Sequence, residues 1–273
     1  PAGITMPEHY STAADLAKLS QALVNETPNY LFYSKQQSFS YNQRFHRATN
    51  LLLKMDPTVD GLKTGFTRAA GYNLAATAIR PSMDMSLSNR RLIVVVMGSK
   101  SAVKRAEVAH KLMNLAYTYT RNEVALKDKQ VLAELPVVQS TLKMFKVATK
   151  KPELITTSLY DQSYSIDLNQ FDQSTQRVML DTGNGTLQSI EPLRETQTHL
   201  NIEVNETQLT APLAKVMQLV TVNVYQNNQL IRTILIEDQV DIEEANFFEK
   251  FLQWLFGLFS STNADVILYP IGK

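Results

Sequence analysis

The tripeptide Lys63-Thr64-Gly65 places a cation, a hydroxyl and a residue without a side chain on three consecutive positions. An ammonium and a hydroxyl can hold a carboxylate by charge-assisted hydrogen bonds, and a glycine lets another backbone approach closely. The tripeptide follows Val59-Asp60-Gly61-Leu62, which is typical of a strand. A strand at a sheet edge can also pair its backbone with an extended peptide. The alternative is that Lys63 is an ordinary solvated lysine on a strand.

The composition excludes several other kinds of chemistry. The chain has no cysteine, so thiolate zinc sites, iron–sulfur clusters, disulfides and a cysteine nucleophile are all absent. The four histidines, at positions 9, 46, 110 and 199, have no pair at the i, i+4 spacing of a helical metal site. We therefore expect no catalytic metal site, and we interpret His9 and His46 as structural or solvated. Covalent chemistry would have to use serine, threonine, lysine or a carboxylate.

Length and charge bound the class of protein. The chain has 273 residues, with 27 Lys+Arg against 26 Asp+Glu, and this balance argues against a nucleic-acid binder. The length suggests one large or two ordinary domains. No run of 18 apolar residues occurs, so no transmembrane helix is predicted. Residues 1–5 lack the features of a signal peptide, as expected either of a cytoplasmic chain or of one whose beginning has been removed.

The chain around the tripeptide predicts a sheet with helices packed on it. Strand patterns cover residues 61–67, 72–79 and 91–97, with a further short strand over 38–42. The segment Arg68-Ala69-Ala70-Gly71 has the length of a hairpin turn, so the first two of these strands should pair antiparallel. Helical spacing predicts helices over 11–25, opened by the capping box Thr12-x-x-Asp15, and over 101–118. Together these elements predict an α+β arrangement of helices on an antiparallel sheet.

Beyond about residue 121 the pattern changes to short β-rich runs. They cover residues 142–148, 163–168, 177–180, 199–204 and 219–224. Turn signals separate them, notably residues 181–185 and Asn227-Asn228. This spacing, without a convincing helix, predicts a small all-β sandwich-like or barrel domain. No catalytic motif is identified in it.

The segment 246–259 is an amphipathic helix with a wide aromatic face. A helix of about 14 residues spans roughly 21 Å, which is short of the ~30 Å hydrocarbon core. We expect it to lie in a membrane interface through Phe247, Phe248, Phe251, Trp254 and Phe256. The alternative is a terminal helix packed on the β domain. The predicted division is therefore residues 1–120, residues 121–240 and an anchor over residues 241–273.

The residues around the tripeptide carry a family resemblance. The run 60–67, followed by Ala70-Gly71-Tyr72-Asn73-Leu74, closely resembles the third active-site motif of the low-molecular-mass penicillin-binding proteins, the D-alanyl-D-alanine carboxypeptidases. Gly3-Ile4 with residues 9–17 is similar to a segment of that family just after its second motif. Residues 205–213 resemble part of its C-terminal β domain, and Asn246-Phe247-Phe248 resembles the start of its membrane anchor. The resemblance implies part of a penicillin-binding/β-lactamase-like transpeptidase domain, followed by the β domain.

The resemblance implies a serine-type carboxypeptidase that removes the terminal D-alanine from peptidoglycan stem pentapeptides, without a cofactor. Lys63 and Thr64 would be catalytic residues that bind the terminal carboxylate, and β-lactams would bind as inhibitors. Gly65, Thr67, Lys100 and Arg47 are further candidates for substrate binding. Phe66 departs from the polar residue that some relatives carry, which leaves fine specificity open. The implied location is the periplasm, peripheral on the outer face of the inner membrane.

The family's other motifs, Ser-x-x-Lys with the nucleophile and Ser-x-Asn, should precede the third one, and only 62 residues precede Lys63. Ser101-x-x-Lys104 and Ser140-x-x-Lys143 lie after Lys63, and Ser40-Tyr41-Asn42 lies only 21 residues before it. We interpret all three as coincidences. We expect the chain to be the C-terminal two thirds of such an enzyme and to be unable, by itself, to form an acyl-enzyme.

Two other readings remain open. One is a non-catalytic, membrane-associated module of the cell envelope that positions partners through its β domain and anchor. The other is a relative of the class A β-lactamases, which share the third motif. The long β domain and the terminal amphipathic helix argue against the second, because neither belongs to a secreted single-domain hydrolase.

Overall fold

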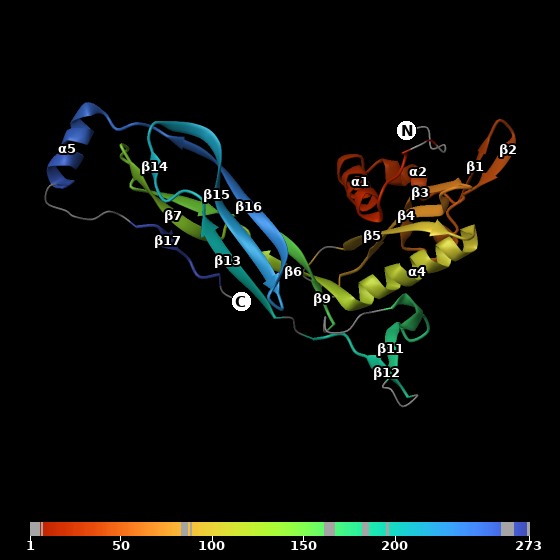
Figure 1. Cartoon of the computed structure of the whole chain (residues 1–273). Coiled ribbons are helices and arrows are strands. Elements are labelled where there is room, and N and C mark those ends of the chain that lie inside the picture. The colour runs from red at the N-terminus through yellow and green to blue at the C-terminus, as the bar shows by residue number, and fades with distance from the viewer. Residues whose placement is uncertain are drawn as a thin grey trace. The chain divides into compact units, whose positions relative to one another are not determined.

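The computed structural model describes residues 6, 8–82, 87, 89–160, 167–181, 186–194, 197–257 and 265–271. The chain forms two compact units (Figure 1). The first unit comprises Pro1–Arg121 and Ser158–Arg194, and the second unit comprises Asn122–Thr157 and Glu195–Lys273. The contiguous ranges 1–120, 121–240 and 241–273 stay a prediction, and the contacts of residues 158–194 group them with the first unit.

A three-stranded antiparallel sheet is the centre of the first unit. Its strands are β3 (Val59–Thr67), β4 (Gly71–Arg80) and β5 (Arg90–Ser99), in the order β3-β4-β5. The predicted antiparallel hairpin of the first two strands is confirmed, with Lys63 opposite Ala75 and Thr64 opposite Leu74. This order leaves β3 at an edge of the sheet.

Two long helices cover the sheet, α1 (Ala13–Glu26) and α4 (Ala102–Tyr119), and they lie on opposite sides of it in Figure 1. The predicted capping box starts α1, because Thr12 Oγ1 accepts from the Asp15 backbone N–H at 3.1 Å and the Asp15 carboxylate accepts from Thr12. Ser101 caps α4. The apolar core on the α4 side consists of Leu52, Leu53, Val59, Leu74, Ala76, Ala78, Val94, Val96, Ala106, Ala109 and Met113.

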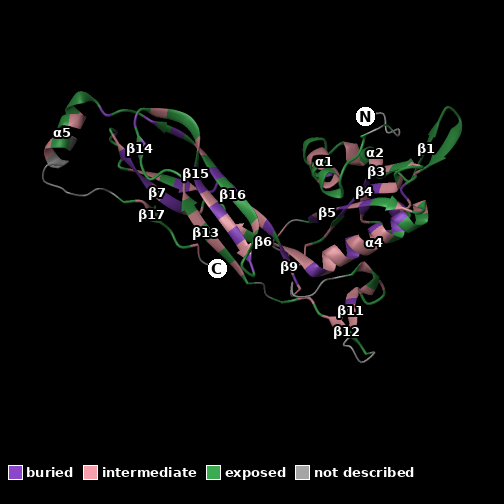
Figure 2. Ribbon diagram, in the orientation of Figure 1, coloured by how far each residue is buried: buried purple, intermediate pink, exposed green. Residues whose placement is uncertain are grey.

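A hairpin of β1 (Ser38–Tyr41) and β2 (Arg44–Arg47) projects from this unit, and both of its faces are exposed (Figure 2). The short helices α2 (Tyr30–Ser34) and α3 (Leu52–Met55) flank it in the sequence. The strand expected over 38–42 is confirmed as β1. The sequence pattern did not predict β2, because the run Arg-Phe-His-Arg has no buried face that would impose an alternation of apolar and polar residues.

Residues 158–194 contribute η1 (Leu168–Gln170), β10 (Phe171–Asp172), β11 (Arg177–Asp181) and β12 (Leu187–Ile190). A small core of Tyr119, Phe171 and Val178 joins them to the end of α4. The Tyr119 hydroxyl accepts from the Val178 N–H at 2.8 Å and donates to the Ile190 carbonyl at 2.6 Å. Of the strand predicted over 163–168, residues 163–166 lie outside the described residues and Leu168 instead opens η1. Residues 182–185 of the predicted turn also lie outside them.

The second unit is β-rich, as the spacing predicts. Its strands are β6 (Thr120–Leu126), β7 (Val131–Val138), β8 (Met144–Ala148), β9 (Glu153–Ser158), β13 (Thr198–Val204), β14 (Leu209–Thr210), β15 (Leu213–Gln226), β16 (Gln229–Ile242) and β17 (Ile267–Leu268). Asn227 and Asn228, at φ 50° and 62°, form the turn between β15 and β16. The core gathers apolar side chains of β7, β15 and β16 among others.

The last described helix is α5 (Phe247–Gly257). Asn246 starts it, because Asn246 Oδ1 accepts from the Glu249 N–H at 2.9 Å and the Glu249 carboxylate accepts from the Asn246 N–H at 2.8 Å. The final residues of the predicted segment, 258 and 259, lie outside the described residues. Among the helices described, none has the length and apolar character needed to cross a membrane.

Candidate functional site

The carboxyl half of β3 forms an open edge. Val59, Gly61 and Leu62 are buried, whereas Lys63 and Gly65 are exposed and Thr64 is half-buried. Among the described strands, β3 pairs only with β4. The other side of Lys63-Thr64-Gly65 is therefore available to an incoming backbone.

The amino half of the same edge is occupied by other parts of the first unit. Ser34 Oγ donates to the Asp60 carbonyl at 2.9 Å, and Asn50 Nδ2 donates to the Gly61 carbonyl at 3.2 Å. A Cβ at Gly61 would lie only 2.8 Å from Ser34 Oγ, so glycine is needed for this close packing. Arg91 holds the Asp60 carboxylate with two bonds of 2.7 and 2.8 Å. The edge thus changes from covered to open between Leu62 and Lys63.

The three residues of the motif offer donors and free space. The Lys63 ammonium is exposed and donates to the Thr64 carbonyl. Thr64 Oγ1 and Thr49 Oγ1 share a hydrogen bond of 2.6 Å, so one proton of this pair is free to be donated elsewhere. A Cβ placed on Gly65 would meet no atom within 4 Å. The arrangement can bind an anion and can accept a peptide backbone beside Gly65.

Arg105 of α4 binds two backbone carbonyls next to this edge. It is only 3% exposed, and it donates to the Thr49 carbonyl at 2.7 Å and to the Asn73 carbonyl at 3.2 Å. Burial lowers the pKa of this guanidinium below its ordinary value, and Tyr72 opposes the shift. Arg105 therefore fixes Thr49 relative to β4. Arg105 and Thr49 were not identified from the sequence as part of this region. The only signal was the position of Arg105 next to Ala106, a residue of the apolar core.

The side chain of Asn73 connects β4 to β5 at the end of the sheet. Its Oδ1 accepts from the Gly98 N–H at 2.9 Å, and its Nδ2 donates to the Gly71 carbonyl at 3.0 Å. These bonds lie where the register of β4 with β5 shifts, between Tyr72 and Leu74. The sequence motif includes Asn73, but its type alone did not reveal this role.

The other predicted site residues lie at different places. Thr67 Oγ1 accepts from the Ala70 N–H at 3.0 Å and so stabilises the β3–β4 turn. Lys100 lines an open hollow at the end of the sheet together with Phe66. Arg47 lies on β2, where its guanidinium carbon is 5.9 Å from the centre of the Phe45 ring. Lys63, Thr64 and Gly65 thus lie together on the open edge of β3, Lys100 lies in the hollow at the end of the sheet, and the described contact of Arg47 is within the hairpin.

The serines whose spacing matches Ser-x-x-Lys or Ser-x-Asn lie in ordinary structural positions. Ser101 Oγ accepts from the Lys104 N–H at 3.0 Å as the cap of α4, and Lys104 lies 3.5 Å from Glu107. Ser140 is buried in the second unit and accepts from the Leu142 N–H at 3.3 Å. Ser40 lies on the exposed strand β1. His46, on the same hairpin, stacks on Phe39 with the ring centres 4.9 Å apart.

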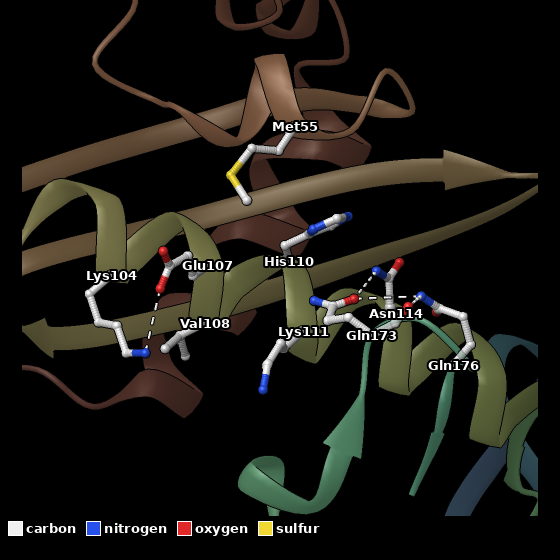
Figure 3. Close-up of a pocket in the computed structure, with 9 residues that line it drawn as sticks. All are labelled: Met55, Lys104, Glu107, Val108, His110, Lys111, Asn114, Gln173 and Gln176. Carbon is white, nitrogen blue, oxygen red and sulfur yellow. Dashed lines mark hydrogen bonds and ion pairs between the residues drawn. The ribbon is translucent and has the colours of Figure 1, made fainter.

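A second hollow, of about 490 Å³, lies on the outer side of α4 (Figure 3). At one end Asn114 Nδ2 donates to Gln173 Oε1 at 2.9 Å, and Asn114 Oδ1 accepts from Arg80 at 2.7 Å. Arg80 also binds the buried Asp56 carboxylate at 2.6 Å. Burial opposes ionisation of Asp56, but hydrogen bonds from Thr58 and Arg80 outweigh it and hold the pKa below its ordinary value. This network joins α4 to its neighbours and contains none of the predicted site residues.

Comparison with known proteins gives consistent matches. A family model described as D-alanyl-D-alanine carboxypeptidase matches residues 1–101. D-alanyl-D-alanine carboxypeptidase DacD of Escherichia coli is 37% identical over 134 residues, which cover 48% of this chain and 33% of the relative. DacC of Escherichia coli is 27% identical over 267 residues, which cover 94% of this chain and 57% of the relative.

The fold comparison agrees. The structure of penicillin binding protein 5 from Haemophilus influenzae superposes with a TM-score of 0.63 at 23% identity, and covers 88% of this chain and 59% of that one. The chain therefore spans between about a third and three fifths of the length of these relatives. Residues 1–101 are therefore similar to the family described as D-alanyl-D-alanine carboxypeptidase, the longer match extends this similarity along most of the chain, and the superposition shows a fold shared with penicillin binding protein 5.

Proposed function

We propose that this chain carries the carboxylate-binding part of a serine D-Ala-D-Ala carboxypeptidase site, which acts on peptidoglycan stem pentapeptides. The observation that carries the proposal is the open edge of β3 at Lys63, Thr64 and Gly65, next to an amino half that is already covered. The names of the relatives supply the substrate class. The role of the site is to fix the end of the peptide and thereby orient its last peptide bond.

The direction of the bound peptide follows from which part of the edge is open. Ser34 and Asn50 occupy the edge before Lys63, so a peptide can extend only from Lys63 toward Thr67. With its terminal carboxylate at Lys63 and Thr64, the peptide then runs antiparallel to β3, in the pairing that β-augmentation uses. Lys63 leaves the Thr64 carbonyl and donates to the carboxylate, while the carbonyl becomes available to a peptide N–H. Since Lys63 is exposed, this exchange needs little rearrangement.

The covalent step of this family uses a serine in Ser-x-x-Lys. In this sequence the pattern occurs only at Ser101 and Ser140, which have the structural contacts described above. We therefore propose that the 273 residues bind the substrate but do not acylate. A β-lactam carries a carboxylate beside its reactive ring, so it should be held by the same two side chains without forming a covalent bond to this chain.

Two measurements test this proposal together. Incubation with labelled penicillin, followed by a denaturing gel, should give no covalently labelled band for this chain. A labelled band would refute the proposal that the 273 residues do not acylate. Equilibrium binding should favour a peptide ending in D-Ala-D-Ala over the same peptide ending in L-Ala-L-Ala. Equal binding of the two peptides would contradict the substrate class. A purely non-catalytic envelope module, with no peptide site, predicts that neither peptide binds.

The helix α5 supports a second part of the proposal, which is attachment to a membrane surface. Phe247 is 88% exposed and Trp254 is 61% exposed, and Phe248 and Phe251 are exposed as well. The side chain of Phe256 lies outside the described residues. Aromatic side chains of this kind favour the interface between lipid and water. We propose a peripheral location on the outer face of the inner membrane, in the periplasm.

Vesicle flotation tests the attachment. The double variant F248S/W254S should lose flotation with lipid vesicles, because it removes two aromatic side chains from the exposed face. Leu235→Ser is the control, since Leu235 is an exposed apolar residue on β16 of the same unit. Unchanged flotation of F248S/W254S would remove the anchor from the proposal.

A further inference from the structure

The open hollow that contains Lys100 lies directly beyond the Lys63 site, and we call it the tip hollow. It has a volume of about 500 Å³. The β3–β4 turn and the end of β5 form its walls, through Phe66, Arg68, Gly71, Tyr72, Ser99 and Lys100 among others. All three strands of the sheet therefore contribute to it.

The charge of the tip hollow is positive. Arg68 and Lys100 are both exposed, and none of the residues that line the hollow is acidic. Within the described part of the chain, neither cation has a hydrogen bond or an ion pair. Two cations without a partner in the lining of one hollow favour the binding of an anionic group there.

Two of the residues that line the tip hollow are aromatic, and their rings are in contact. The rings of Phe66 and Tyr72 lie 4.3 Å apart, and the buried Arg105 guanidinium carbon lies 5.8 Å from the centre of the Tyr72 ring. Gly71 has φ +66°, and a Cβ there would come within 3.0 Å of the Ser99 carbonyl oxygen. These contacts fix the aromatic part of the lining, which suits the methylene groups of a ligand side chain.

The tip hollow continues the path of the proposed peptide. Phe66 is two residues beyond Thr64, and the peptide runs toward it. At about 3.4 Å per residue, Arg68 lies roughly 14 Å along the chain from Thr64. If the terminal residue is held at Lys63 and Thr64, the side chain that reaches the hollow belongs to a residue two or three places before the end.

We propose that the tip hollow is a second carboxylate subsite, in which Arg68 and Lys100 bind an acidic side chain two or three residues before the terminal D-alanine. The proposal rests on the proposed function, because it uses the direction of the bound peptide. It makes the protein selective for stem peptides that carry a free carboxylate at this position over those in which the group is an amide.

The test uses two peptides that end in D-Ala-D-Ala and differ only in the preceding residue, which is glutamate in one and glutamine in the other. Binding to the full chain is measured by calorimetry at low salt. Two exposed ion pairs should make the glutamate peptide bind about fivefold more tightly. The double variant R68Q/K100Q should bring this ratio to about one. Lys54→Gln removes an exposed lysine of α3 that does not line the hollow; it is the control for the loss of a surface cation and should keep the ratio.

The possible failures are distinguishable. A ratio of about one in the unaltered protein, or a ratio that persists in R68Q/K100Q, overturns the subsite while the Lys63 site stands. Lys63→Gln should weaken both peptides by a similar factor and preserve their ratio. If neither peptide binds, or if Lys63→Gln changes neither, the proposed function itself is wrong and the subsite fails with it.

Discussion

Replacement of Arg105 by methionine should destabilise the first unit by about 2–4 kcal/mol. The change removes two part-buried hydrogen bonds, to the Thr49 and Asn73 carbonyls, and a hydrogen bond from a charged group contributes about 1.5–3 kcal/mol. Removal of a buried charge regains part of this loss, because the guanidinium no longer has to be desolvated. The free energy lost with the two hydrogen bonds should exceed this gain, since the bond to Thr49 is only 2.7 Å long and Arg105 is 3% exposed. Against a typical stability of about 5–15 kcal/mol, the protein should remain folded.

Urea unfolding, followed by circular dichroism, measures this loss. Lys104→Met is the matched control, because Lys104 is the exposed neighbour on the same helix and its ion pair with Glu107 should contribute at most about 0.5 kcal/mol. Arg105→Lys keeps the charge but replaces the forked guanidinium by a single ammonium, so it should recover part of the loss. A loss below about 1 kcal/mol for Arg105→Met, comparable to that of the control, would refute the supporting role of Arg105.

The remaining predictions concern the Asp56 network, the β3–β4 turn and the Tyr119 hydroxyl. Asp56 has its pKa held below the ordinary 3.8, so its contribution to stability should be present above that value and lost as the pH falls below it. Unfolding free energies from urea titrations at several pH values should therefore fall in acid less steeply for Asp56→Asn than for the unaltered chain, and equal slopes would contradict this. Gly71→Ala should cost about 1–2 kcal/mol because of the positive φ and the 3.0 Å approach to Ser99, and a neutral effect in the same titration would be a contrary result. Tyr119→Phe should cost about 1–2 kcal/mol through the lost bonds to Val178 and Ile190, and an unchanged midpoint of thermal unfolding would count against it.

The sequence could predict the elements whose pattern is local. The capping box of Thr12 and Asp15 identified the start of α1, and the alternation in β3 and β4 with a short turn identified their antiparallel pairing. Lys63-Thr64-Gly65 was recognisable because a cation, a hydroxyl and a glycine follow one another within a segment that has a strand pattern. The open character of the edge depends on Ser34 and Asn50, which cover only its first half, and no local pattern reports this.

The features that the sequence did not predict depend on distant contacts. Residues 158–194 group with the first unit because Phe171 and Val178 pack on Tyr119, although their own pattern resembles the other β-rich runs. The support of Thr49 by Arg105 joins residues 56 positions apart, so no spacing rule could reveal it. Nor does the β2 run show the alternation that marks a half-buried strand, since both faces of the hairpin are exposed.

The most direct test of the central claim compares a free and an amidated carboxyl end. A peptide ending in D-Ala-D-Ala should bind the unaltered chain about tenfold more tightly than its C-terminal amide, because Lys63 and Thr64 bind the carboxylate by charge-assisted hydrogen bonds. In Lys63→Gln the two peptides should bind with nearly equal affinity. If amidation has no effect on the unaltered chain, or the same effect on Lys63→Gln, the open edge of β3 does not hold the end of a peptide.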